Sequence, residues 1–341
     1  MFKKIFVLFL LFLLINCCIK INSSYYQNNN EQIIINLKNK ALYYVRYNYP
    51  FEQQLFALLD YYKYVQNDNI ILEHLIRVNY ELQNIIDVNY YLEELLKIDP
   101  QNNFAKNFKE KKANELIIEK YYLYYETPNF KCYYKDANYY TIIKTLVEEL
   151  ENQFVFIAND FEYFNKTNKI IILFYSIEDY DNLSTKPYWS SAYYDGKIRI
   201  NTYLFKKGDI RNILKHELIH SIITLKSGYK VPIWLHEGLA QYYEFNKKIY
   251  FKFPEEYKLK FLSLQKIENS FNILEPDEIE IAYLESLFLI KYILEIYGER
   301  IIIELLNEFK KNNNFDEVYR KILLRDRETL EFEFKNYLKN A

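Results

Sequence analysis

Three of the four histidines in this 341-residue chain lie in one short stretch, together with glutamates that could share their chemistry. His216 and His220 are four residues apart, so a helix would project both imidazoles from one face, where they can bind the same metal ion. Glu217 follows the first histidine and would lie beside that face. A carboxylate there can reach a water molecule at the ion without being a ligand, which suits a general base.

A catalytic zinc ion takes three protein ligands and keeps a fourth position open for water. Glu237 is the predicted third ligand, because it lies in the first turns of a second helix that starts at Pro232. It follows His220 by 17 residues, which allows for a helix end, a loop through Gly228 and a helix that returns to face the first one. The adjacent Gly238 leaves room for close packing near the metal.

Two neighbours of Glu237 are predicted to support the site. Gln241 comes one turn later on the same face, where its amide could hydrogen-bond the outer nitrogen of a ligand histidine. His236 is adjacent to Glu237, and neighbouring helix residues point about 100° apart, so both cannot easily bind one ion. We therefore assign Glu237 as the ligand and His236 to the wall of the site or its supporting residues. A three-histidine site is the alternative.

The helix that carries the two histidines is apolar on nearly all sides, which is typical of a helix in a protein interior. Buried histidines and glutamates are costly in free energy unless they are paired or bind a metal. This composition favours one Zn²⁺ per chain over a chance arrangement of histidines on a surface. The apolar positions are Ile213, Leu214, Leu218, Ile219, Ile222 and Ile223.

The second half of the chain predicts an α+β domain over residues 126–341. The segments NFKCYYK and KIIILFYS have the length and composition of strands, and a long amphipathic helix separates them. Asp195-Gly196 suits the tight turn of a β-hairpin. From Asp209, a predicted helix N-cap, the remaining residues indicate helices. The expected domain is therefore mostly helical with a small β-sheet.

Residues 32–125 predict consecutive helices with apolar residues at three- and four-residue spacing. Breaks fall at Tyr49-Pro50, at residues 67–69 and at Asp99-Pro100. Helices of about 13 residues with short breaks are typical of stacked helical hairpins, and the turn at Asp99 is similar to that of a tetratricopeptide repeat. Such repeats could present a concave surface to a protein partner.

The N-terminus predicts export. Residues 1–18 have the form of a signal peptide, with lysines followed by an apolar run from Ile5 to Ile15 that is shorter than the roughly 20 residues of a membrane span. Cys17 lies at the end of a sequence that loosely matches a lipobox. The protein is therefore expected to be either a lipoprotein that faces outside the cytoplasm or a secreted protein. An uncleaved signal anchor is the third alternative. Residues 19–31 are polar and indicate a flexible tether. Membrane contact is expected only through this N-terminal lipid or anchor.

Charge and cysteine content exclude other classes. The net charge is −2 and opposite charges are mixed along the chain, which gives no basic surface for nucleic acid. If residues 1–18 are removed, only Cys132 remains, and one cysteine cannot form an internal disulfide. It is expected to be a small buried residue.

The combined motifs resemble the gluzincin metallopeptidases and, more closely, the peptidase MA-like family, which often follows tetratricopeptide repeats. The family has a His-Glu-x-x-His motif, which corresponds to HELIH at residues 216–220. It also has a Pro-x-Trp-x-x-Glu-Gly-x-Ala motif, which corresponds to PIWLHEGLA at residues 232–240. The similarity extends from about residue 128 to the C-terminus. It implies zinc-dependent hydrolysis of peptide bonds, with His216, His220 and Glu237 as ligands. Glu217 would be the base and later the proton donor.

The resemblance also implies further site residues. Tyr283, in a family-like Tyr-x-x-Ser sequence, is the candidate for stabilising the oxyanion, with a packing role equally open; Tyr193 and Tyr242 are alternatives. The position of Gln241 is often acidic in the family, so a neutral amide there would make the ligand histidine less basic. An edge strand is expected to pair with an extended substrate. Its central residues are Ser191, Ala192 and Tyr193.

Three functions are consistent with the sequence. The first is an exported zinc metallopeptidase that cleaves peptides or proteins. The second is a surface-attached repeat protein that binds a partner and carries an inactive protease-like domain; the intact Glu217 argues against it, because an inactive site would be free to lose its base. The third is a zinc amidase that acts on cell-wall peptides.

Overall fold

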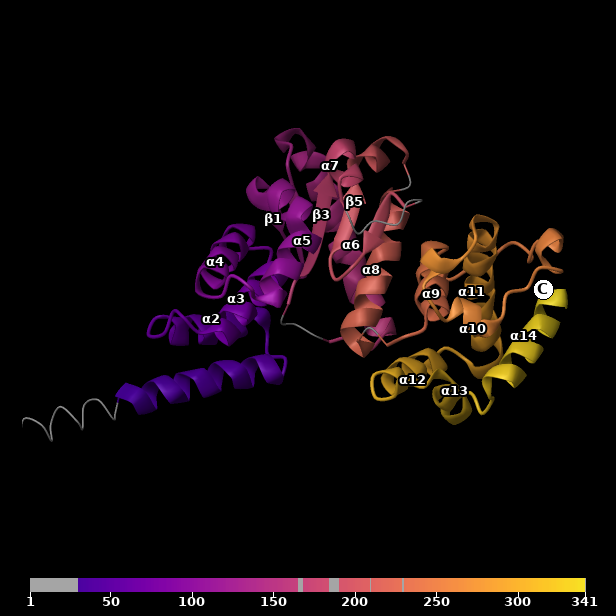
Figure 1. The fold of residues 1–341 in the computed structure, drawn as a ribbon. Helices are drawn as coiled ribbons and strands as arrows, with labels where there is room; N and C mark the ends of the chain where they lie inside the picture. The colour runs from indigo at the N-terminus through magenta and orange to yellow at the C-terminus, as the bar shows by residue number, and fades with distance from the viewer. Residues whose placement is uncertain (1–29, 165–167, 184–189, 209, 229, 341) are drawn as a thin grey trace, which may run out of the picture. The chain divides into compact units, whose positions relative to one another are not determined.

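A computed structural model describes residues 30–164, 168–183, 190–208, 210–228 and 230–340 (Figure 1). The predicted signal peptide, Cys17, nearly all of the tether and the N-cap candidate Asp209 lie outside the described residues. The chain divides into two compact units between Lys120 and Tyr121. None of the described helices is both long and apolar enough to cross a membrane.

The N-terminal unit consists of consecutive helices. Asp68 caps α3 (Asn69–Glu81) by accepting hydrogen bonds from the N–H groups of Ile70 and Ile71. Asn102 caps α5 (Asn103–Ile118) by accepting one from the N–H of Ala105. Leucine, isoleucine and tyrosine side chains form a core within this unit. The predicted helices are present, and their assignment to tetratricopeptide repeats stays a prediction. The helices are residues 30–46, α2 (Phe51–Tyr62), α3 (Asn69–Glu81), α4 (Ile85–Ile98) and α5 (Asn103–Ile118).

A five-stranded mixed sheet begins the C-terminal unit, in the order β1-β2-β3-β5-β4. The inner strands β2, β3 and β5 are parallel, while β1 and β4 pair antiparallel at the two edges. The predicted strands and hairpin are present. Residues 123–125, which the sequence analysis placed in the helical segment, instead belong to β1. The strands are β1 (Leu123–Glu126), β2 (Phe130–Tyr134), β3 (Ile170–Tyr175), β4 (Ala192–Tyr194) and β5 (Ile198–Asn201).

Helices make up the rest of this unit, which confirms the predicted mostly helical α+β fold. They are α6 (Tyr140–Asp160), α7 (Ile177–Asp181), α8 (Ile210–Ser227), α9 (Ile233–Glu244), α10 (Leu264–Ile267), α11 (Pro276–Tyr297), α12 (Arg300–Phe309), α13 (Phe315–Ile322) and α14 (Arg327–Asn340). Short 3₁₀ turns occupy Glu119–Tyr121, Ala137–Tyr139, Thr202–Lys206, Glu255–Tyr257 and Phe271–Ile273.

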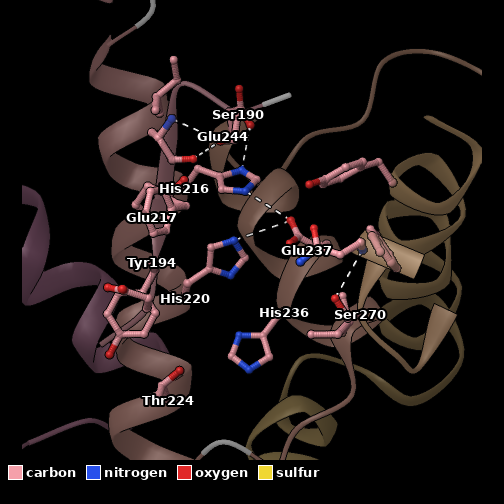
Figure 2. Close-up of a pocket in the computed structure, with 18 of the residues that line it drawn as sticks. Ser190, Tyr194, His216, Glu217, His220, Thr224, His236, Glu237, Glu244 and Ser270 are labelled. Atoms are coloured by element: carbon pink, nitrogen blue, oxygen red, sulfur yellow. Dashed lines mark hydrogen bonds and ion pairs between the residues drawn. The ribbon is translucent and has the colours of Figure 1, made fainter. Parts of the chain in front are cut away.

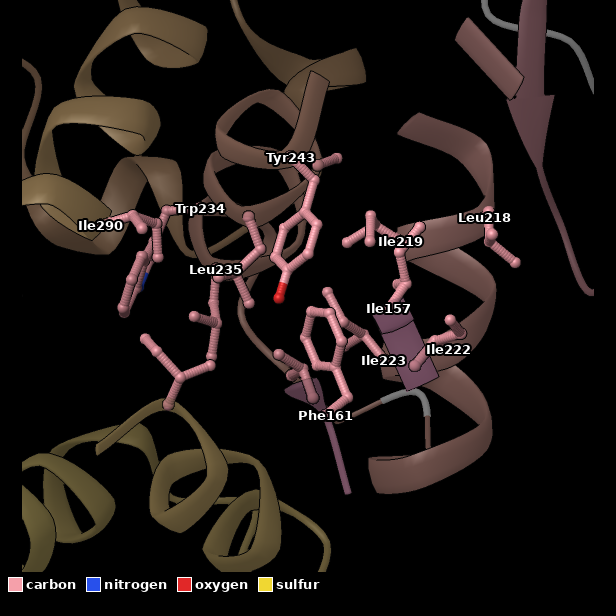
Figure 3. Packing of buried hydrophobic residues seen from close by; sticks show 14 of the residues in the cluster. Ile157, Phe161, Leu218, Ile219, Ile222, Ile223, Trp234, Leu235, Tyr243 and Ile290 are labelled. Carbon is pink, nitrogen blue, oxygen red and sulfur yellow. The ribbon is translucent and has the colours of Figure 1, made fainter. Parts of the chain in front are cut away.

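Helix α8 lies in the interior of the C-terminal unit, as its apolar composition predicts. It packs against α6, against β4 and β5, and against α9, which in turn packs against α11. Figure 3 shows Tyr243 of α9 beside Phe161, which follows α6, with Ile219 and Ile223 of α8 next to both rings. The rings of Phe161 and Tyr243 are 5.2 Å apart. Packing on several sides fixes the direction in which the remaining face of α8 points.

A buried chain of hydrogen bonds holds the beginning of α9. The indole N–H of Trp234 donates to the hydroxyl of Tyr319 at 2.9 Å, and this hydroxyl donates to Glu268 at 2.9 Å. Arg327 donates to the same carboxylate at 3.0 Å, and the backbone N–H of Ile233 donates to the carbonyl of Glu268 at 3.1 Å. The first turn of α9 is therefore tied to the last two helices of the chain.

Glu285, in the middle of α11, is a second buried carboxyl group in this unit. It is 1% exposed and accepts the N–H of Leu262 at 3.0 Å. Burial raises its pKa from 4.5 to about 8, although this hydrogen bond and Lys335 favour the ionised form. Because the folded pKa lies above the unfolded value, this group contributes stability that is complete below about pH 4.5 and is lost as the pH rises through 8.

We expect Glu285→Gln to remove this pH dependence, since the amide keeps the acceptor and cannot ionise. Between pH 5 and pH 8 the variant should gain on the order of 3 kcal/mol in free energy of unfolding relative to wild type. Urea unfolding followed by tryptophan fluorescence measures this, because both tryptophans lie in the C-terminal unit. Glu280→Gln, an exposed change in the same helix, is the control. A stability difference that does not vary with pH would contradict the burial effect.

Candidate metal centre

Helix α8 presents His216 and His220 on one face, directed toward α9 (Figure 2). Their ring centroids are 4.8 Å apart, as expected for residues one turn apart. The other faces of the helix are buried through Leu218, Ile222 and Ile223. The two imidazoles are therefore held toward the same point by a helix that cannot rotate without breaking its core contacts.

Glu237 reaches the same point from α9. Its Oε2 atom lies 3.4 Å from Nε2 of His216 and 3.5 Å from Nε2 of His220. Ligand atoms of the three residues all fall within 4.8 Å of one another. The two helices pack directly against each other, so the sequence separation of 17 residues is closed by the loop between them.

A shared metal ion explains the positions of these three side chains better than direct hydrogen bonds among them do. Oε2 of Glu237 is buried and makes no hydrogen bond within the described part of the chain, although two imidazole nitrogens lie close to it. Buried polar atoms are nearly always paired, so this atom indicates a missing partner. Two imidazole nitrogens and one carboxylate oxygen are a donor set that suits Zn²⁺.

The electrostatics of the site favour a positive charge there. Burial alone would lower the pKa of His216, but contact with the carboxylates of Glu237 and Glu244 outweighs it and raises the pKa to about 10. Burial would likewise raise the pKa of Glu237, but the two histidines lower it well below its usual range. A cation at this position, whether a proton or a metal ion, is stabilised by the same carboxylates.

Glu217 is buried beside the histidines and lines the same cavity. Its Oε2 atom has no hydrogen-bond partner among the described residues. Burial raises the pKa of Glu217, and the neighbouring His220 and His216 oppose this shift. A carboxylate whose pKa is raised accepts a proton more readily, which is the property that a general base needs.

The structure corrects the expected role of Gln241. Its amide donates to the backbone carbonyls of Glu237 and, across the helix interface, of Tyr283, at 3.2 and 2.8 Å. Glu244 makes the contact expected of Gln241: its Oε2 lies 3.1 Å from Nδ1 of His216. The carboxylate comes seven residues, or two helical turns, after Glu237, and this spacing on one face is the sequence pattern that could have identified it.

Glu244→Gln is expected to weaken zinc binding by about 10–100-fold, because a carboxylate at the outer nitrogen fixes the ring and makes it more basic. Calorimetric titration of the metal-free protein with zinc measures the dissociation constant. Gln241→Ala is the matched control in the same helix and should leave the constant nearly unchanged, since its amide contacts no ligand side chain. If Gln241→Ala weakens zinc binding more than Glu244→Gln does, Gln241 is the residue that supports the ligand histidine, as the sequence analysis predicted.

These residues face a cavity of about 620 Å³ that opens beside the proposed ligands. It is lined by residues of β4, α8, α9 and α11 and includes Phe271 and Tyr283, whose rings are 5.3 Å apart. Tyr283 and Tyr193 therefore remain candidates for contact with a substrate. Tyr242 is not among the described lining residues.

The predicted substrate strand forms one wall of this cavity. Ser191, Ala192 and Tyr193 all line it, and β4 is an edge strand that pairs only with β5 in the described sheet. The N–H of Ala192 donates to the hydroxyl of Ser190 at 3.2 Å, while the carbonyl of Ser191 accepts from Asn201 of β5. An extended substrate that paired at Ala192 would therefore replace a contact that Ser190 makes in its absence.

His236 lines the cavity but does not belong to the group of potential ligands. Its ring centroid lies 5.6 Å from that of His220. Burial and the nearby His220 lower the pKa of His236 to about 3, so its imidazole is neutral. The structure thus places His236 in the wall of the site, beside the second proposed ligand.

Comparison with known proteins identifies a family for the C-terminal part of the chain. Residues 196–340 match the family model of the peptidase MA superfamily, whose peptidases usually depend on a metal. This match confirms the resemblance seen in the sequence: the chain carries a peptidase MA superfamily domain, a metallopeptidase-like domain that contains every proposed ligand. A search of curated proteins found no match to the chain.

Proposed function

We propose that this protein is an exported zinc metallopeptidase that hydrolyses peptide bonds. The observation that carries the proposal is the convergence of His216, His220 and Glu237, with ligand atoms within 4.8 Å of one another. Glu217 lies in the same cavity with an unpaired buried oxygen. A peptidase domain acts on peptides or proteins, and the cavity beside the edge strand β4 offers a place for an extended chain.

In this proposal His216, His220 and Glu237 hold one Zn²⁺. When bound, zinc supplies Lewis-acid polarisation of the scissile carbonyl and activation of water. Glu217 takes a proton from the attacking water and later delivers it to the leaving amine. Glu244 orients His216, and Tyr283 is the candidate donor to the oxygen that develops negative charge.

Export is proposed from the N-terminal sequence, with its lysines and its apolar run from Ile5 to Ile15. Lipidation at Cys17 would hold the protein on a membrane surface, whereas simple cleavage would release it. In either case the peptidase domain faces the outside of the cytoplasm. The helical N-terminal unit is the proposed docking site for a protein partner.

The metal content of the protein tests this proposal. We expect about one zinc ion per chain in the protein from Ser23 to Ala341, and we expect His220→Ala to lose it, because two ligands bind zinc far more weakly than three. Metal analysis after gel filtration measures the stoichiometry, and circular dichroism checks that the variant is folded. A folded wild-type protein that neither contains zinc nor takes it up would overturn the proposal.

A further inference from the structure

The imidazole of His236 is a polar group without a partner inside the cavity. No hydrogen bond or ion pair is made by its side chain within the described part of the chain, although the residue is partly buried. Water in the open cavity can satisfy such a group, and a ligand that displaces this water loses affinity unless it replaces the hydrogen bonds. The ring nitrogens of an imidazole can donate or accept hydrogen bonds.

A second such group lies at the same end of the cavity. Thr224 comes one turn after His220 on α8, and its hydroxyl also makes no hydrogen bond to the described residues. Figure 2 shows Thr224 and His236 beyond His220, on the side away from His216. Thr224 is near the end of α8 and His236 near the start of α9, so both lie close to the connection between these helices.

Two apolar residues at the start of α9 also line the cavity. They are Val231, which precedes the helix, and Ile233, its first residue. No lysine or arginine is present among the described lining residues, so an acidic side chain would find no counter-charge. The adjacent residue, Glu237, directs its carboxylate toward the two proposed ligand histidines, with Oε2 3.4 and 3.5 Å from their Nε2 atoms. We define the His236 subsite as the region lined by Thr224, Val231, Ile233 and His236.

We infer that the His236 subsite binds an uncharged substrate side chain that has an apolar stem and a hydrogen-bonding end, such as that of glutamine or threonine. The apolar stem would contact Val231 and Ile233, and the polar end would bond to His236 and Thr224. This inference rests on the proposed function, because the subsite is defined beside the metal ligands. Sites with buried polar groups discriminate strongly against analogues that leave these groups unpaired.

Amino-acid hydroxamates are suitable probes, because they bind zinc and carry one side chain. Two pairs match polar and apolar side chains of similar size: glutamine with methionine hydroxamate, and threonine with valine hydroxamate. Calorimetry would measure their binding to the zinc-loaded full chain with Glu217→Gln, which prevents turnover. The same titrations would be made with His236→Phe, with Thr224→Val, and with His74→Phe as the matched control outside the site.

In the parent protein we expect the polar member of at least one pair to bind about tenfold more tightly than its apolar partner. His236→Phe should reduce this ratio to within about twofold of one, and Thr224→Val should reduce it in part. The affinity for the apolar probes and the zinc content should stay unchanged in these variants, whereas a general loss of structure would lower both. The His74→Phe control should keep the binding ratio of the parent protein.

Three results would overturn the subsite: no discrimination in the parent protein, a ratio that survives His236→Phe, or loss of zinc in that variant, which would make His236 a metal ligand. Failure of the proposed function is distinguishable from these results. In that case the parent protein itself takes up no zinc, and the subsite, which is defined by its position beside the metal, is overturned with it.

Discussion

Glu217→Gln is expected to lower the rate of peptide hydrolysis by up to about 10⁴-fold while zinc stays bound. The amide has the shape of the carboxylate but cannot accept a proton from water or return one to the leaving amine. His216 and His220 keep their positions because α8 is fixed by its buried isoleucines and leucines. Initial rates on a mixture of quenched fluorescent peptides, together with metal analysis, measure both quantities.

Glu304→Gln, an exposed change on α12, is the control for this experiment and should behave as wild type. If Glu217→Gln hydrolyses peptides at the wild-type rate, the assignment of the base is wrong. If activity and zinc are lost together in a folded variant, Glu217 acts on the metal site itself and not as a base. The three outcomes therefore separate a role in proton transfer from a role in holding the metal.

Gly238→Ala is expected to destabilise the C-terminal unit by about 3 kcal/mol or more and to weaken zinc binding. Gly238 follows Glu237 in α9 and lies directly against α11. An added Cβ would be 2.6 Å from Cγ1 of Ile290 and 2.8 Å from the carbonyl carbon of Ser286, and closer still to the carbonyl oxygen of Ser286. Since backbone atoms of a packed helix cannot move aside, α9 must shift and carry Glu237 with it.

Gly228→Ala is an informative control, because this glycine has a positive φ of 76° but nothing lies within 4 Å of an added Cβ. Backbone strain of about 1–2 kcal/mol is the expected cost there, with zinc binding retained. Urea unfolding and zinc titration of both variants compare the two effects. Equal losses of stability and of zinc affinity would show that the contact between α9 and α11 is not what positions Glu237.

The proposed ligands could be predicted from the sequence because helical periodicity alone decides most of their geometry. His216 and His220 share a face at any four-residue spacing, and Glu237 needs only a helix that returns past them. The supporting residue could not be assigned in this way. Gln241 and Glu244 both lie near the face of Glu237, and the choice between them depends on the carbonyl of Tyr283, which captures the amide of Gln241 from another helix.

The limits of prediction for the fold have a similar cause. Strand β3 is buried throughout and was evident as an apolar run, whereas β1 is largely exposed and has no alternation of apolar and polar residues. Its extended conformation depends on pairing with β2, a tertiary contact. The parallel pairing of β3 with β5 is likewise absent from any local pattern, although each strand was predicted separately.

The hydrogen bonds that begin at Trp234 have a consequence for the growing chain. All three proposed ligands have been synthesised by residue 237, but the groups that fix the start of their second helix follow much later, at Glu268, Tyr319 and Arg327. A nascent polypeptide that stops between these points has the motif residues and lacks the contacts that hold α9 in place. Formation of the proposed metal site is therefore expected to require synthesis of the chain as far as Arg327.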